Sequence, residues 1–84
     1  MIKKTFKLKE GTGLHSRAAA KFVKITSSFE SDVFLEKGNM NLNAKSIMGL
    51  LSTGITGGDE IDIIVDGEDE KEAMEAIEEF IVTI

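Results

Sequence analysis

The sequence predicts an α+β fold, an open-faced two-layer β-sandwich in which three helices cover one face of a four-stranded antiparallel sheet. Three observations lead to this prediction. Segments with alternating apolar residues are interleaved with segments of helical spacing, in the order β-α-β-β-α-β-α. Lys and Asp alternate with the apolar residues of the strands, which leaves the second face of the sheet to solvent. The length of 84 residues corresponds to a single domain, residues 1–84.

The first strand and the first helix are indicated by a change of period. Residues 2–8 alternate in the manner of a strand, but Lys4 falls on the apolar side, which we expect near an end or an edge of the sheet. A glycine-bearing loop follows at 10–15, and residues 16–27 have helical spacing. The apolar stripe of this helix consists of Ala19, Phe22, Val23 and Thr26, with Phe29 just past its end.

The middle of the chain predicts a hairpin followed by a short helix. Residues 32–37 and 40–43 both alternate, and a Lys-Gly-Asn turn joins them. Residues 46–53 have the composition of a short helix, for which Ser46 is well placed as the N-cap. Gly54 is the expected C-terminal stop, because glycine readily adopts the left-handed conformation that ends many helices.

The last strand and the last helix have the clearest patterns. Residues 60–66 alternate strongly, and Asp69 followed by Glu72 resembles a capping box that opens a helix. The opposite face of this helix carries much of the acidic surplus of the chain. Its expected buried stripe consists of Ala73, Met74, Ile77, Phe80 and Ile81.

Composition excludes several kinds of chemistry. The chain has no cysteine and a single histidine, His15, which excludes disulfides, thiol nucleophiles and zinc sites made of cysteines or several histidines. We therefore expect no metal and no cofactor. No apolar run approaches the ~20 residues that span a membrane, and the N-terminus lacks a signal-peptide pattern. The expected location is the cytoplasm, without membrane insertion.

The net charge of −5 is unevenly distributed along the chain. Residues 1–42 carry eight Lys and Arg against four Asp and Glu, whereas residues 43–84 carry two against eleven. The overall sign argues against nucleic acid as a partner. The asymmetry allows a local basic face that meets an acidic protein or a phosphate.

His15 is the main candidate for a chemical role. It lies where the glycine-bearing loop meets the first helix, and a helix start stabilises anions through its free N–H groups and partial positive charge. Arg17 adds a cationic fork suited to phosphate oxygens, and a neutral imidazole is a competent nucleophile near pH 7. A lone histidine near a helix start is more often an ordinary surface or capping residue, and a phosphoryl carrier is the alternative that these features allow.

Two segments resemble a known family, namely GLHSRAAAKFV (13–23) and NAKSIMGLLSTGI (43–55). Over the whole chain the sequence is similar to the HPr family, the histidine-containing phosphocarriers of the bacterial phosphoenolpyruvate-dependent sugar phosphotransferase system. The resemblance implies that His15 accepts a phosphoryl group from enzyme I and passes it to IIA domains of sugar permeases. It also implies that Arg17 steadies this group.

The resemblance implies regulation and docking as well. Ser46 matches the serine that HPr kinase/phosphorylase phosphorylates from ATP in many Gram-positive-type bacteria, where the product is a corepressor with the catabolite control protein. We expect Leu50 to be buried and Met48 and Leu51 to face partners. The full expected docking set consists of Ala20, Lys21, Lys24, Lys45, Ile47, Met48 and Leu51.

Two departures from the family pattern lie beside the histidine. Ala18 stands where the family usually has proline, and Ser16, a possible helix cap, stands where it usually has alanine. Both bear on the rate of transfer and on partner choice. The expected protein is a monomer without catalysis of its own. The first alternative is a mainly regulatory paralogue, although the family's regulatory form lacks the histidine that is retained here as His15. The others are a specialised branch of phosphotransfer, such as a nitrogen-related one, and an interaction module that is not phosphorylated.

Overall fold

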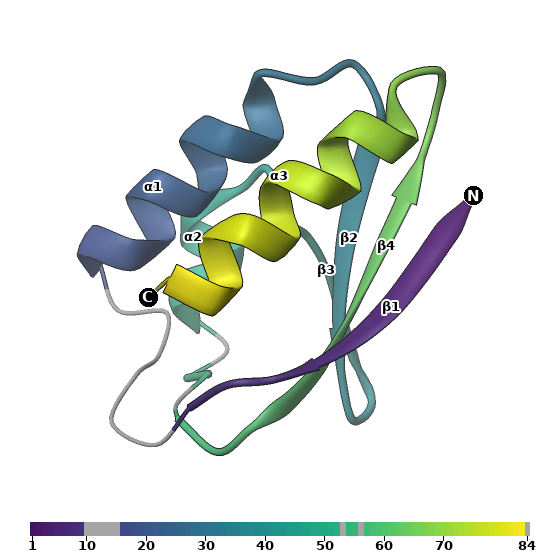
Figure 1. Cartoon of the computed structure of the whole chain (residues 1–84). Helices are drawn as coiled ribbons and strands as arrows, with labels where there is room; N and C mark the ends of the chain where they lie inside the picture. Colours follow the sequence, from purple (N-terminus) through teal and green to yellow (C-terminus); the bar gives the residue numbers. More distant parts are fainter. Residues whose placement is uncertain (10–15, 53, 56, 84) are drawn as a thin grey trace.

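The computed structural model confirms the predicted architecture (Figure 1) and describes residues 1–9, 16–52, 54–55 and 57–83. One face of the sheet is covered by the helices and the other is open. None of the described helices is long and apolar enough to cross a membrane. The elements in chain order are β1 (Ile2–Lys7), α1 (Ser16–Ser27), β2 (Asp32–Lys37), β3 (Met40–Asn43), α2 (Ile47–Ser52), β4 (Glu60–Asp66) and α3 (Glu70–Thr83).

The sheet has the strand order β1-β4-β2-β3, and every neighbouring pair is antiparallel. The central pairing of β2 with β4 sets Val33 opposite Val65 and Leu35 opposite Ile63, and all four side chains are buried under the helices. Since successive side chains in a strand point to opposite faces, this register also fixes which residues lie on the open face.

Lys4 lies on the helix-covered side of β1, as its place in the sequence pattern predicted. The strand order makes β1 an edge strand, so the long side chain can reach past the core. Its ammonium group donates a hydrogen bond of 2.9 Å to the carboxylate of Glu78 on α3. The expectation of an edge position for this lysine is confirmed.

The core fills the space between the sheet and the helices. Phe22 of α1 and Phe80 of α3 stack with ring centroids 5.6 Å apart, which joins the two long helices. The hydroxyl of Thr26, fully buried on α1, lies 3.0 Å from the carbonyl oxygen of Ala44, just after β3. This contact fixes the end of α1 against the segment that leads into α2.

Asp69 directly precedes α3, but its side chain binds residues that are distant in the sequence. Its carboxylate accepts hydrogen bonds of 2.9 Å from the backbone N–H groups of Glu30 and Ser31, and a further one from the Ser31 hydroxyl. The capping-box pattern therefore located the start of α3 correctly, but the carboxylate oxygens bind the turn just before β2. Gly67 lies so close to Ser31 that the two turns are in direct contact.

Replacing Gly67 with alanine should destabilise the protein. The added Cβ would lie 2.5 Å from the Ser31 Oγ and 2.6 Å from its backbone Cα, so the two turns must separate, at a cost of about 1–3 kcal/mol. The matched control is Gly49→Ala in α2, where the nearest atom would be 3.5 Å away. Urea unfolding measures both variants. Equal stability of the two would contradict the close approach.

Asp69 should also make stability depend on pH. Its pKa is lowered from 3.8, first by the Ser31 hydroxyl and then by the backbone N–H groups of Glu30 and Ser31. The folded state thus binds this proton more weakly than the unfolded state, so the stabilisation is present above the ordinary pKa and is lost as the pH falls through the lowered one.

An Asp69→Asn variant lacks this titration, so its free energy of unfolding should fall less between about pH 5 and pH 3. The pKa of Glu70 is lowered mainly by a hydrogen bond from the Met1 ammonium group. Its titration therefore keeps part of the pH dependence of the free energy of unfolding in both proteins. Urea unfolding at four pH values gives the two curves. Parallel curves for the variant and the parent protein would show that the contact does not carry the pH dependence.

Candidate functional site

The start of α1 carries the predicted phosphate-binding features. The predicted acceptor His15 lies outside the described residues and is covalently adjacent to Ser16, the first residue of α1. Arg17, in the first helical turn, has an exposed side chain. A helix of 12 residues presents free N–H groups and partial positive charge at this end.

The two departures from the family pattern fit within this helix start. Ser16 is the first helical residue, one position later than an N-cap, so the expectation that it caps α1 is not met. Ala18 is buried in the first turn. The helix therefore begins at Ser16 without the fixed φ angle that proline would supply.

α2 begins directly after Ser46, as the sequence predicted, and is described as far as Ser52, whereas the predicted last residue, 53, lies outside the described residues. The Gly49 N–H donates to the Ser46 Oγ at 3.2 Å, and the Leu50 N–H donates to the Ser46 carbonyl oxygen at 3.1 Å. Ser46 is therefore the N-cap of α2. Gly54 has a φ angle of +65°, which confirms it as the C-terminal stop.

α2 buries one side chain and exposes three large apolar ones. Leu50 is 0% exposed, whereas Met48 is 79% exposed. Ile47 and Leu51 are also exposed, and we call these three residues the α2 apolar surface. The expected division between Leu50 and its neighbours is confirmed. Exposed apolar side chains gathered on one short helix make this surface a candidate for docking.

The neighbouring α1 contributes an exposed alanine and two lysines. The side chains of Ala20, Lys21 and Lys24 are all exposed, and α1 packs against α2. Among the residues that the structure describes, no carboxylate forms an ion pair with either lysine. Their charges are available to an acidic partner.

Lys45 differs from the other two lysines. Its ammonium group donates a hydrogen bond of 2.9 Å to the carbonyl oxygen of Phe29, just beyond α1, and its side chain is half-buried. A cation at this position binds a carbonyl near the end of the helix. This lysine therefore holds the chain before Ser46 against α1, a contact that the sequence pattern did not predict.

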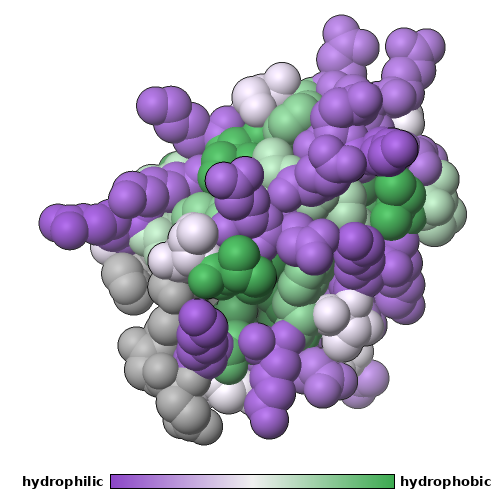
Figure 2. Space-filling model, in the orientation of Figure 1, coloured by the Kyte–Doolittle hydropathy of each residue, from purple (hydrophilic) through white to green (hydrophobic). Residues whose placement is uncertain are grey.

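Hydrophilic side chains interrupt the hydrophobic surface of the molecule. In the view of Figure 2, hydrophobic surface is visible only in small areas separated by hydrophilic side chains. One apolar pair was missed by the sequence analysis, namely Phe34 and Ile64 on the open face of the sheet. The alternation of β2 around Val33 and Leu35 was the signal that could have found it.

Comparison with known proteins now assigns a family. The family described as "PTS HPr component phosphorylation site" matches residues 2–83, nearly the whole chain. The order of elements and the antiparallel sheet are those of this family. The chain belongs to the HPr family.

Individual relatives are similar over almost their whole length. The HPr-like protein Crh of Halalkalibacterium halodurans is 48% identical over 81 residues, which cover 96% of both chains. The phosphocarrier protein HPr of Neisseria meningitidis is 40% identical over 81 residues, 96% of this chain and 91% of that one. The relatives thus include both phosphocarriers and a Crh protein.

A solved structure matches closely as well. The crystal structure of HPr from Thermoanaerobacter tengcongensis superimposes with a TM-score of 0.94 at 42% identity, covering 99% of this chain and 93% of that one. A second structure of HPr from that organism is described as a dimer, with a TM-score of 0.78 at 42% identity over 99% and 95% of the chains. The match confirms the fold class and the order of elements.

Removing the cap of α2 should cost stability without changing the fold. Ser46→Ala deletes the acceptor for the Gly49 N–H and should lower the free energy of unfolding by about 0.5–2 kcal/mol. Ser46→Asp keeps an acceptor and should stay close to the parent protein. Urea unfolding and amide NMR spectra measure both effects. Shifts spread over the whole fold in Ser46→Asp would contradict a local role.

Proposed function

We propose that this protein is a phosphocarrier of the bacterial phosphoenolpyruvate-dependent sugar phosphotransferase system. It accepts a phosphoryl group on His15 from enzyme I and donates it to IIA domains of sugar permeases. The observation that carries this proposal is the single histidine directly before α1, with the exposed guanidinium of Arg17 in the first turn. Family membership supports the same chemistry.

The transfer itself needs a nucleophile and a place for negative charge. The lone pair of the imidazole nitrogen, Nδ1 in the family, forms the N–P bond while the bond from phosphorus to the donor breaks, and its electron pair leaves with the donor. Free N–H groups at the start of α1 and the guanidinium of Arg17 stabilise the phosphoryl oxygens. The protein supplies no further catalytic group, so it acts as the substrate of its donor and acceptor enzymes.

The α2 apolar surface is the proposed docking site for these partners. Its three exposed side chains belong to α2, which packs against α1, the helix that carries the exposed Lys21 and Lys24. An apolar centre with a charged rim is the usual composition of a transient interface. The lysines favour acidic partners and speed their association.

Ser46 is the proposed regulatory site. Phosphorylation by HPr kinase/phosphorylase would add about 1.5 to 2 negative charges at the start of α2. The modified serine lies directly before Ile47, the first residue of the apolar surface. Phosphorylation would therefore change the charge that partners meet, and the serine-phosphorylated form would bind the catabolite control protein. We place the protein in the cytoplasm as a monomeric carrier.

A mainly regulatory, Crh-like role is the second candidate. It is favoured by the 48% identity to the Crh protein of H. halodurans, against 40% to the N. meningitidis phosphocarrier. In such a role Ser46 would be phosphorylated and His15 would not. The phosphate acceptor therefore separates the two candidates.

Incubation with enzyme I and phosphoenolpyruvate should give an acid-labile, alkali-stable phosphate, located on His15 by mass spectrometry. His15→Ala should abolish it. Arg17→Ala should slow transfer by about tenfold or more, because a cation that stabilises the phosphoryl oxygens is lost. The control is Lys71→Ala, which removes an exposed charge from the first turn of α3 at the far end of the molecule in Figure 1 and should change the rate by less than about twofold.

The outcome decides between the two candidate roles. No phosphate on the protein with a matched enzyme I would exclude the carrier role, and phosphate on Ser46 with HPr kinase and ATP would then support the regulatory one. Normal transfer by Arg17→Ala would show that the start of α1 suffices without the guanidinium.

Met48→Ser should weaken docking. The variant removes the most exposed side chain of the α2 apolar surface, so the KM of enzyme I for the protein should rise by about tenfold. The control is Val82→Ser on α3, which removes another exposed apolar side chain. Steady-state phosphotransfer kinetics measure both variants. An equal rise in KM for the two would rule out a specific role of the α2 apolar surface.

A further inference from the structure

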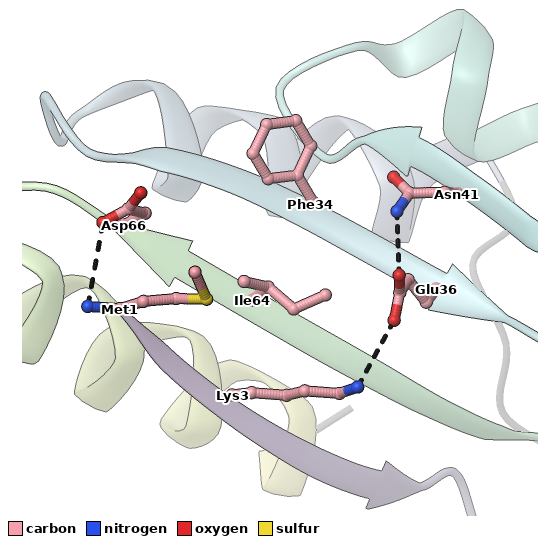
Figure 3. A pocket seen from close by; sticks show the side chains of 7 residues that line it. All are labelled: Met1, Lys3, Phe34, Glu36, Asn41, Ile64 and Asp66. Carbon is pink, nitrogen blue, oxygen red and sulfur yellow. Dashed lines mark hydrogen bonds and ion pairs between the residues drawn. The ribbon is translucent and has the colours of Figure 1, made fainter.

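The open face of the sheet carries a hollow with a volume of about 310 Å³, lined by three apolar and four polar or charged residues (Figure 3). Phe34 of β2 and Ile64 of β4 lie directly opposite each other in the register, on the face away from the helices. Phe34 is 37% exposed, and the Met1 side chain lies beside Ile64. Large apolar side chains on an otherwise polar sheet face indicate a contact surface.

Pairs of carboxylates flank this apolar pair along the strands. Asp32 lies opposite Asp66 on one side of it. Glu36 lies opposite Asp62 on the other side. Like charges directly opposite each other destabilise a sheet, so a carboxylate pair that no cation neutralises carries an electrostatic cost. A cationic partner would relieve that cost.

The two carboxylate pairs are neutralised to different extents. The Lys3 ammonium group lies 3.5 Å from Glu36 and 3.8 Å from Asp62, so it neutralises part of the negative charge of this pair. On the first pair, the Met1 ammonium group is 3.7 Å from Asp66 but 2.9 Å from Glu70, its nearer partner. Asp32 has no ion pair among the residues that the structure describes. The negative charge of the pair Asp32–Asp66 is therefore the less neutralised one, and a further cation would be stabilised there.

We propose that this face binds a basic segment of a partner protein. An apolar side chain of the segment covers Phe34 and Ile64, and an Arg or Lys beside it reaches Asp32 and Asp66. A second copy using the same face is a poor fit, because it would bring carboxylate pairs against each other. The hollow lies on the opposite side of the sheet from the helices, so it is separate from the docking surface proposed above.

The probe for this site is an acetylated and amidated hexapeptide of alternating Arg and Leu. Titration of ¹⁵N-labelled protein should shift the amide signals of β2 and β4 around Phe34 and Ile64. The double variant Asp32→Asn/Asp66→Asn should weaken binding at least about tenfold. The matched control Glu75→Gln/Glu79→Gln removes the same charge from the exposed face of α3 and should leave the affinity within about twofold.

Further arms test the nature of the occupant. A hexapeptide of alternating Arg and Ser should bind more weakly, because it cannot cover the apolar pair. Equal binding of that peptide, or equal weakening by both double variants, would show unspecific charge attraction and overturn the proposal. Spermidine shifting the same amides as strongly would assign the face to small cations instead. Absence of shifts, or self-association through this face in sedimentation velocity, would also overturn it.

Discussion

The buried hydroxyl of Thr26 fixes the end of α1 against the segment that leads into α2. It lies 3.1 Å from the Val23 carbonyl oxygen of its own helix and 3.0 Å from the Ala44 carbonyl oxygen. The next residue, Lys45, binds the carbonyl oxygen of Phe29. The end of α1 is thus tied to the two residues that lead into Ser46, so α2 has a fixed position beside α1. These ties hold α2, which carries the α2 apolar surface, against the helix that carries Lys21 and Lys24.

Burial of the sheet on one side only sets the distribution of charge. The helix-covered side needs apolar residues from every strand, so the carboxylates of β2 and β4 are confined to the open face. The cations of α1 are exposed, and α1 lies on the other side of the sheet. One small domain thereby presents two surfaces. One is cationic, the other is anionic, and each has an apolar centre of its own. Opposite charges on the two surfaces favour different partners.

Local pattern predicted the elements because each depends on neighbours in sequence. The alternation in 60–66 and the helical spacing in 16–27 agree with β4 and α1 to the residue. The bonds of Asp69 were not predictable, since they join residues 38 and 39 positions apart and arise only after β2 and α3 have packed. At the candidate site, the cap at Ser46 was local and was found. The tie through Lys45 spans 16 residues and was missed.

The alanine at position 18 changes the helix start in a way that can favour an anion. The first four N–H groups of a helix have no partner within it, and Ala18 is the third residue of α1. A proline there would fix φ but would remove one of these donors. The chain forms α1 from Ser16 without proline, so the rigidity is not required for folding. We therefore expect the alanine to give up some preorganisation while offering one more backbone N–H to a phosphoryl group on His15.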